Sequence, residues 1–182
     1  NGMIKEVINR LNMASIETKY TEYKIGFTFF NTPDRYRHNE GKLNYSNVSQ
    51  IAKVACSMTN IPRKSSIPGM IIIGVSDNES DYKEWKNHFK SNAYKYKGHR
   101  VVGIDEESKV HYRNIDNLLN AFEARVETEP ISDEMKEDLK NYDVITIHGR
   151  TLIVITITAS SGQLYNGKTY IREGSDIKEV IG

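Results

Sequence analysis

The stretch MIIIGV, at residues 70–75, decides the fold, because it is a continuous apolar run without the polar alternation of a half-exposed strand. Such a strand must be covered on both faces, so we expect it at the centre of a sheet. A second apolar run, TLIVITIT at 151–158, follows DVITIHG and predicts a hairpin that turns at Gly149. Both runs are too short to cross a bilayer as helices, which favours a soluble protein with no membrane partner.

Helical periodicity flanks these strands. Apolar residues at 4, 7, 8 and 11 predict a first helix that ends near Met13. The segment YSNVSQIAKVACSMTN predicts a second helix over 45–60, capped by Asn44 or Ser46. Further helices are expected over 81–96, 114–127 and 132–142, and further strands over 20–30, 99–105 and 168–175. No repeat or linker divides the chain, so we expect one α+β domain over residues 1–182, with a mixed β-sheet packed with helices.

Composition favours a cytoplasmic location. A single cysteine excludes an internal disulfide framework and fits a reducing compartment. The first residues, NGMIKEVINRL, lack the apolar core of a secretion signal, and Asn1-Gly2 before Met3 reads as a remnant of cloning. The five histidines show no zinc-ligand spacing.

Charge is unevenly distributed although the formal net charge is only +1. Six basic residues face one glutamate in the segment 83–100, which carries +5, and eight acidic residues face three basic ones in the segment 123–143, which carries −5. Only the basic segment could attract phosphates across a Debye length of about 8 Å. The sequence therefore predicts a bipolar surface.

Two glutamates and a lysine stand close together in ETKYTEYK, at residues 17–24. Glu17 and Glu22 are five residues apart, so a straight strand points them to opposite faces and a continuous helix leaves them roughly 140° apart. They converge only where the chain bends between them, just before the strand that contains Glu22. Lys24 shares the strand face of Glu22, and Asp77 lies directly after the central strand, where sites are commonly built.

Three converging carboxylates raise one another's pKa and are relieved by a divalent cation that prefers oxygen ligands, such as Mg²⁺ or Mn²⁺. A cation held by Glu17, Glu22 and Asp77 could activate a water against a phosphodiester, with Lys24 on the phosphate. The alternative interpretation is that these are ordinary solvated surface residues, and spacing alone leaves both open.

The basic segment 83–100 interleaves aromatic residues with cations, which is typical of surfaces that bind single-stranded nucleic acid. Trp85 and Phe89, four residues apart on a helix, could instead form its buried face. Near the end of the chain, TYIREGS places Tyr170 and Arg172 on one face, and a turn at Gly174 could aim Arg172 or Ser175 at the site. The predicted nucleic-acid contacts are Lys83, Lys86, Lys90, Lys95, Lys97, Arg100 and Arg172.

Taken in order, six segments resemble the Schlafen AlbA-type domain: EYK after an upstream glutamate, IAKVACSMTN, GMIIIGVSD, VVGID, LIVITIT and YIREGS. The resemblance covers about residues 15–178. It implies an α+β fold with a mixed sheet, described as DNA-binding in bacterial members. In the animal Schlafen core, a similar lobe cleaves transfer and ribosomal RNA at a metal-dependent site of three carboxylates, which by position match Glu17, Glu22 and Asp77.

The sequence departs from the family pattern in two insertions, at 31–43 and within SMTNIPRKSSIPG, and in SSGQLYNG, which replaces the usual proline before the last strand. The insertions leave Glu79 and Asp81 as rivals of Asp77 for the third acid. The animal core joins two lobes, whereas one lobe is present here, so a homodimer or a longer protein could complete a groove.

The leading hypothesis from the sequence is a nucleic-acid-binding domain that acts as a divalent-metal-dependent endoribonuclease on structured RNA such as transfer RNA, with RNA favoured over DNA. The alternatives are a non-catalytic DNA-binding regulatory module of a larger protein and a protein–protein scaffold.

Overall fold

The computed structural model describes residues 2–13, 19–29, 43–61 and 67–181. A mixed four-stranded sheet in the order β1-β2-β7-β6 forms its centre. Strand β1 runs parallel to β2, and the other neighbours are antiparallel. The strands are β1 Thr21–Lys24, β2 Met70–Ile73, β6 Asp143–Ile147 and β7 Arg150–Thr156.

Strand β2 is the central strand expected from MIIIGV. All four of its residues are buried, and it lies between β1 and β7. Because side chains alternate along a strand, Ile71 and Ile73 enter one hydrophobic core, whereas Met70 and Ile72 enter the other. The apolar run is therefore explained by cover on both faces of the sheet.

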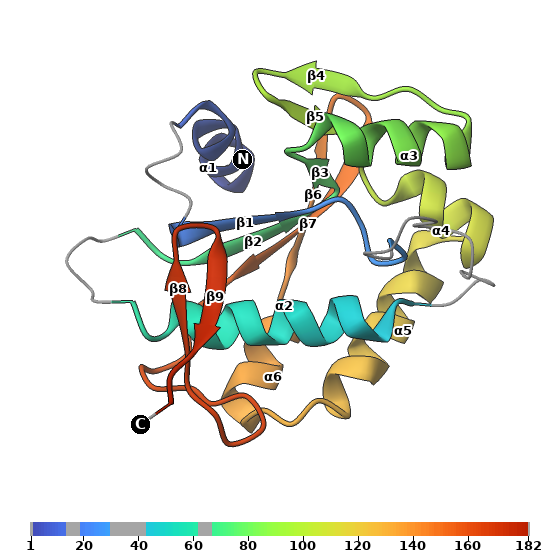
Figure 1. The fold of residues 1–182 in the computed structure, drawn as a ribbon. Helices are drawn as coiled ribbons and strands as arrows, with labels where there is room; N and C mark the ends of the chain where they lie inside the picture. The colour runs from blue at the N-terminus through green and yellow to red at the C-terminus, as the bar shows by residue number, and fades with distance from the viewer. Residues whose placement is uncertain (1, 14–18, 30–42, 62–66, 182) are drawn as a thin grey trace.

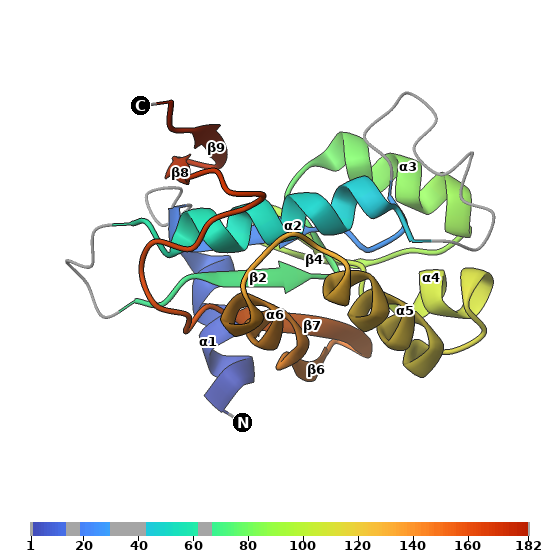
Figure 2. The ribbon, with the colours of Figure 1, turned by 90° about the horizontal axis from the view of Figure 1, so that it is seen from below.

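Helices cover one face of this sheet (Figures 1 and 2). They are α2 Tyr45–Met58, α5 Ile115–Glu127 and α6 Asp133–Lys140. Asn44 caps α2 by accepting a hydrogen bond from the backbone N–H of Ser46, and Ser132 caps α6 by accepting one from Met135. The apolar faces of these helices pack on the isoleucines of β2 and β7.

Helix α1, Gly2–Asn12, and a small second sheet cover the opposite face (Figure 1). The second sheet has the order β3-β5-β4, and helix α3 packs beside it. Short helix α4 leads from this sheet to α5, and a final hairpin, β8–β9, packs on α2. The bounds are β3 Val75–Ser76, α3 Glu79–Phe89, β4 Tyr94–Tyr96, β5 His99–Val101, α4 Asp105–His111, β8 Tyr170–Glu173 and β9 Asp176–Glu179.

The helix that ends near Met13 and the hairpin turn are confirmed, and His148 and Gly149 in that turn both have positive φ. The strands predicted over 20–30 and 99–105 are shorter than expected, because β1 ends at Lys24 and β5 ends at Val101. The single helix predicted over 81–96 is wrong, because α3 ends at Phe89 and residues 94–96 form a strand. Lys90 terminates the helix with a left-handed backbone, φ 52°. No helix within the described residues is long and apolar enough to span a bilayer.

Residues 25–29 leave β1 and are held by a buried carboxylate from α4. Glu107 accepts hydrogen bonds from the backbone N–H groups of Phe27 and Thr28, at 3.0 and 3.1 Å, and from the Thr28 hydroxyl, at 2.6 Å. A Cβ on Gly26 would lie 2.6 Å from the Glu107 carboxylate, so only glycine allows this approach. Burial raises the pKa of Glu107 to about 7, although the three donors act in the opposite direction.

Glu107→Gln tests this contact. The amide turns an NH₂ group toward backbone donors, so we expect a loss of about 1–3 kcal/mol in the free energy of unfolding at pH 5. Because the folded pKa lies above the ordinary value of 4.5, the folded state holds its proton more tightly. The stabilisation by native Glu107 is therefore complete below pH 4.5 and is lost as the pH rises through about 7.

Urea unfolding between pH 5 and 8 measures both effects. The stability gap between the native protein and Glu107→Gln should narrow with rising pH, whereas the exposed Asp116→Asn on α5 should show a small gap that does not change. A difference in unfolding free energy between the native protein and Glu107→Gln that stays constant from pH 5 to 8 would contradict the raised pKa of Glu107.

Candidate functional site

Glu22 lies in β1, the edge strand of the main sheet, and forms an ion pair with Arg172 of β8. Arg172 Nη1 donates to Glu22 Oε2 at 2.8 Å, and Nη2 donates to the carbonyl of Thr21 at 2.9 Å. The Arg172 side chain is 1% exposed and the Glu22 side chain 17% exposed. A buried guanidinium thus joins the last hairpin to the edge strand, and Figure 1 shows the hairpin beside β1.

The sequence predicted that the last strand could aim Arg172 at the site, and Arg172 does contact Glu22. Gly174 makes the turn with φ 61°, and Ser175 is exposed there. The structure does not favour the predicted contact between Arg172 and nucleic acid, because protein covers the guanidinium. Its contacts point to a role in holding Glu22 rather than in docking.

Lys24 follows Glu22 by two residues and therefore shares its strand face. Burial lowers the pKa of the Lys24 ammonium; the carboxylates of Glu22 and Asp77 oppose that shift, and Arg172 adds to it. Two carboxylates and two cations are therefore close enough to influence one another. The half-buried Lys24 and the buried guanidinium of Arg172 are stabilised by the carboxylates near them.

Asp77 comes directly after β3 and is exposed. Its charge also affects the pKa values of Tyr23 and His99 on the other face of β1, where the two ring centroids lie 4.7 Å apart. Burial raises the pKa of Tyr23 to about 12; Arg10 opposes this and Asp77 contributes to it. Burial also lowers the pKa of His99, against the charge of Asp77. Asp77 thus lies at the end of β1, within reach of both of its faces.

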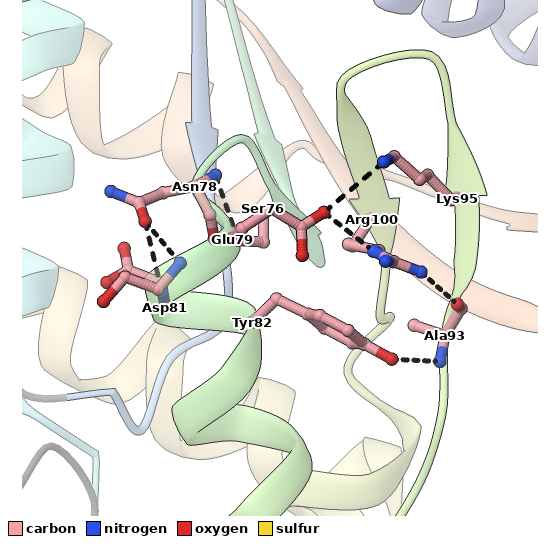
Figure 3. A network of polar contacts seen from close by, with 9 residues as sticks. Ser76, Asn78, Glu79, Asp81, Tyr82, Ala93, Lys95 and Arg100 are labelled. Carbon is pink, nitrogen blue, oxygen red and sulfur yellow. Dashed lines mark hydrogen bonds and ion pairs between the residues drawn. The ribbon is translucent and has the colours of Figure 1, made fainter.

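The rivals of Asp77 point in different directions, as Figure 3 shows. Glu79 Oε1 accepts a hydrogen bond from Arg100 Nε at 3.1 Å and lies 4.0 Å from Lys95 Nζ, so its carboxylate is held by the β4–β5 hairpin. Asp81 lies in the first turn of α3, whose cap Asn78 accepts hydrogen bonds from the N–H groups of Ser80 and Asp81. Asp81 lines the same pocket as Asp77, whereas Glu79 does not.

A metal site would need the third predicted acid, Glu17, which lies outside the described residues. Within the part of the chain that the structure describes, no group of three or more His, Cys, Asp or Glu residues is arranged to hold a metal ion. Glu22 and Asp77 supply carboxylate oxygens, the donor class that Mg²⁺ and Mn²⁺ prefer. The residues therefore fit such an ion in donor chemistry, as two of its three predicted ligands.

A pocket of about 600 Å³ opens beside Lys24 and Asp77. It lies between the end of β1, the first turns of α2 and the β3–α3 connection. Its described lining residues are Tyr23, Lys24, Ile25, Gly26, Phe29, Asn44, Ser46, Asn47, Gln50, Val75, Ser76, Asp77 and Asp81. The volume falls in the range of small-molecule sites, about 300–1,000 Å³.

The basic segment divides into a buried and an exposed part. Trp85 and Phe89 are 2% and 7% exposed and form a core cluster with Tyr82, so the alternative interpretation of these two aromatic residues is confirmed. Tyr94 of β4 is 48% exposed and stacks on His148 of the β6–β7 turn at 3.6 Å between ring centroids. The exposed predicted cations are Lys83, Lys86, Lys90, Lys95 and Lys97, whereas Arg100 is half-buried.

Sequence reasoning missed the amide side of the pocket. Asn47 and Gln50 are three residues apart on α2, which places them on one helix face beside the buried positions Val48 and Ile51. That spacing could have indicated a polar wall, because two amides beside the buried face of a helix lie close to the strands on which the helix packs. The contact with β1 that turns them into a pocket wall was not visible in the sequence.

Comparisons with known proteins agree with this architecture. A family model described as Schlafen, AlbA_2 matches residues 17–181. No curated protein matches the sequence. Among solved structures, the DIP2311 protein from Corynebacterium diphtheriae has a similar fold, with a TM-score of 0.50 and 14% sequence identity. The match covers 99% of this chain and 27% of that one, so this chain spans about a quarter of the length of its structural relative.

Arg172→Met should leave Glu22 without its partner and release the hairpin from β1. We expect a loss of about 3 kcal/mol in unfolding free energy, because one member of a largely buried ion pair remains uncompensated. The matched control is Lys178→Met in the same hairpin, whose partner Glu173 lies 3.9 Å away with both side chains mostly exposed. That change should cost less than about 1 kcal/mol by chemical denaturation. Equal losses for the two variants would refute the anchoring role.

Proposed function

The chain belongs to the Schlafen AlbA_2 family, and from this membership we propose that it binds nucleic acid and acts on RNA as a divalent-metal-dependent endoribonuclease. Binding of nucleic acid is what the family implies. Cleavage, the metal ion and a preference for structured RNA such as transfer RNA are the finer parts of the proposal.

One observation carries the finer proposal: Lys24 lies within electrostatic reach of both Glu22, in β1, and Asp77, directly after β3. Surface residues distributed at random would not gather two acids and a half-buried lysine beside a pocket. Perturbed ionisable groups next to a cavity are typical of sites that handle protons or charge.

The proposed roles follow from side-chain chemistry. Glu22 and Asp77 would hold the cation together with Glu17, and Arg172 would keep Glu22 in place. A bound Mg²⁺ or Mn²⁺ supplies a water of lowered pKa and positive charge for the phosphodiester. Lys24, which lines the pocket, would hold a nonbridging phosphate oxygen as a point charge.

Docking would use the α3 and β4–β5 surface. Lysines along α3 and the hairpin are exposed, and Tyr94 presents a ring held by His148. Cations meet the phosphates while an exposed ring accepts an unstacked base, the combination that single-stranded segments of RNA require.

The runner-up is a binding-only module for DNA with a regulatory role. The observation in its favour is the ion pair of Glu22 with Arg172, since a carboxylate held by a buried guanidinium already has a structural role without any metal. In that case Glu22 would stabilise the hairpin and the exposed lysines would carry the whole function.

Asp77→Asn tests the catalytic proposal, because Asp77 is exposed and its loss should leave the fold intact. Purified protein with Mn²⁺ or Mg²⁺ should cut end-labelled transfer RNA, and chelator should stop it. The variant should lose at least about a hundredfold in cleavage rate, a loss of roughly 2.7 kcal/mol in transition-state stabilisation.

Binding separates loss of chemistry from loss of docking. Removal of one negative charge should leave the affinity for transfer RNA unchanged or slightly higher, as measured by gel shift with chelator present. Cleavage that persists in Asp77→Asn, or that needs no divalent cation, would rule out this site. Tight binding without cleavage by the native protein would favour the DNA or regulatory alternative.

Lys97→Ala in the β4–β5 turn tests the docking surface. Removal of one phosphate contact should weaken binding about equally for all sequences and reduce the slope of log affinity against log salt by about 1. Lys136→Ala on α6, on the opposite face of the main sheet, is the charge-matched control and should leave the slope unchanged. Equal slopes for the two variants would show that nucleic acid docks elsewhere.

A further inference from the structure

We propose that the pocket beside Lys24 receives a single unpaired nucleobase of the bound strand, so that the preferred substrate carries a bulged or single-stranded nucleotide at the site. This inference rests on the proposed nucleic-acid function and deepens it. It assigns a specificity subsite to residues of β1, α2 and the β3–α3 connection.

The pocket is lined by two kinds of group, apolar residues and side-chain amides, which suit the faces and the edge of a nucleobase. Ile25, Gly26 and Val75 give an apolar wall against which a flat ring can lie, with Phe29 beside it. The side-chain amides of Asn47 and Gln50 also line the pocket, and Asn47 lies directly beside the Gly26 backbone, to whose carbonyl it donates at 2.7 Å. A nucleobase has apolar faces and an edge of mixed donors and acceptors, and an amide presents both a donor and an acceptor.

These amides are available for an incoming group. Asn47 Nδ2 donates to the carbonyl of Gly26 at 2.7 Å, which fixes the orientation of the side chain and leaves Oδ1 as its remaining acceptor. Within the described ranges, neither Asn47 Oδ1 nor the Gln50 amide forms a hydrogen bond. Asn44 is different, because both ends of its amide hold the backbone of Phe29 and Ser46.

Charge argues for a base and against a phosphate inside the pocket. Asp77 and Asp81 both line it, and a phosphate placed between them would meet like charge. Lys24 provides the compensating cation on the β1 side. The arrangement suits a nucleotide whose phosphate stays at Lys24 while its neutral base enters the pocket.

The free energy needed to move a base into the pocket depends on whether that base is paired, and this difference determines which RNA is preferred. Extruding a base from a duplex costs a few kcal/mol, and the cost is least for a nucleotide that is already unpaired. The gain is comparable, since one stacked base contributes about as much as a tenfold change in affinity or more. A protein with this pocket therefore prefers bulged or single-stranded RNA over a continuous duplex.

The experiment compares two short RNA duplexes that differ only in one bulged 2-aminopurine, with chelator present to prevent cleavage. The native protein should bind the bulged RNA about tenfold more tightly than the continuous duplex, and binding should change the 2-aminopurine fluorescence as the base leaves its neighbours. Gln50→Ala, which removes a base-edge contact, and Ser46→Leu, which fills the exposed rim of the pocket, should each abolish the preference. Neither should alter the affinity for the duplex.

Asn120→Ala removes an exposed amide from α5, outside both the pocket and the docking surface, and should keep both the preference and the fluorescence change. Thermal melting of each variant confirms that it is folded. Equal affinity of the native protein for the two RNAs would overturn the base pocket and leave the proposed function standing. Failure of both RNAs to bind at low salt would instead overturn the proposed function, and the pocket inference with it.

Discussion

Gly74 carries the constraint on which the site depends. It joins β2 to β3 with φ 110°, donates its N–H to the carbonyl of Lys24 at 2.7 Å and accepts hydrogen bonds from the N–H groups of Val102 and Gly103. A Cβ at this position would lie 2.7 Å from Leu152 and 3.0 Å from the backbone of Gly103. Only glycine fits, and its bonds fix the end of β1 against the start of the β3 connection. Gly74 thus holds the backbone segments that carry Lys24 and Asp77 against each other. For this reason both residues line one pocket.

The charges around that end of β1 balance without a metal ion. Glu22 and Asp77 are countered by Arg172 and Lys24, so the described cluster folds as a nearly neutral group. This alters the reasoning from sequence, in which three carboxylates required a cation in order to coexist. A third carboxylate from Glu17 or an incoming phosphodiester would make the site net negative, and a divalent cation would then restore the balance. The described charges alone therefore do not require a metal ion, and the proposed cation would be needed where Glu17 or a phosphodiester adds negative charge.

The parts of the fold that depend on local pattern were predictable. MIIIGV reads as a buried central strand, and Ser132 reads as a cap, because burial and capping are decided within a few residues. The helix predicted to continue through 94–96 failed because Lys90 ends α3 with a left-handed backbone, and a strand of only three residues, Tyr94–Tyr96, is too short for its alternation to outweigh the helical pattern before it. The Glu22–Arg172 pair joins residues 150 positions apart, and nothing local announces it. The pocket likewise needs three separate segments to meet, which only the folded sheet determines.

The bipolar surface expected from the sequence has a spatial counterpart. The basic segment lies in α3, β4 and β5, and the acidic segment spans the end of α5 and helix α6, on opposite faces of the main sheet (Figures 1 and 2). A chain of net charge +1 has almost no overall attraction for nucleic acid, but an electric dipole of this kind turns the basic face toward a polyanion and the acidic face away from it. The half-buried Lys24 and the buried guanidinium of Arg172 add little to this long-range orientation, because Glu22 and Asp77 neutralise them. Under the proposed function, exposed lysines would set how the strand arrives, and the compensated cluster with its pocket would act only on the nucleotide that reaches it.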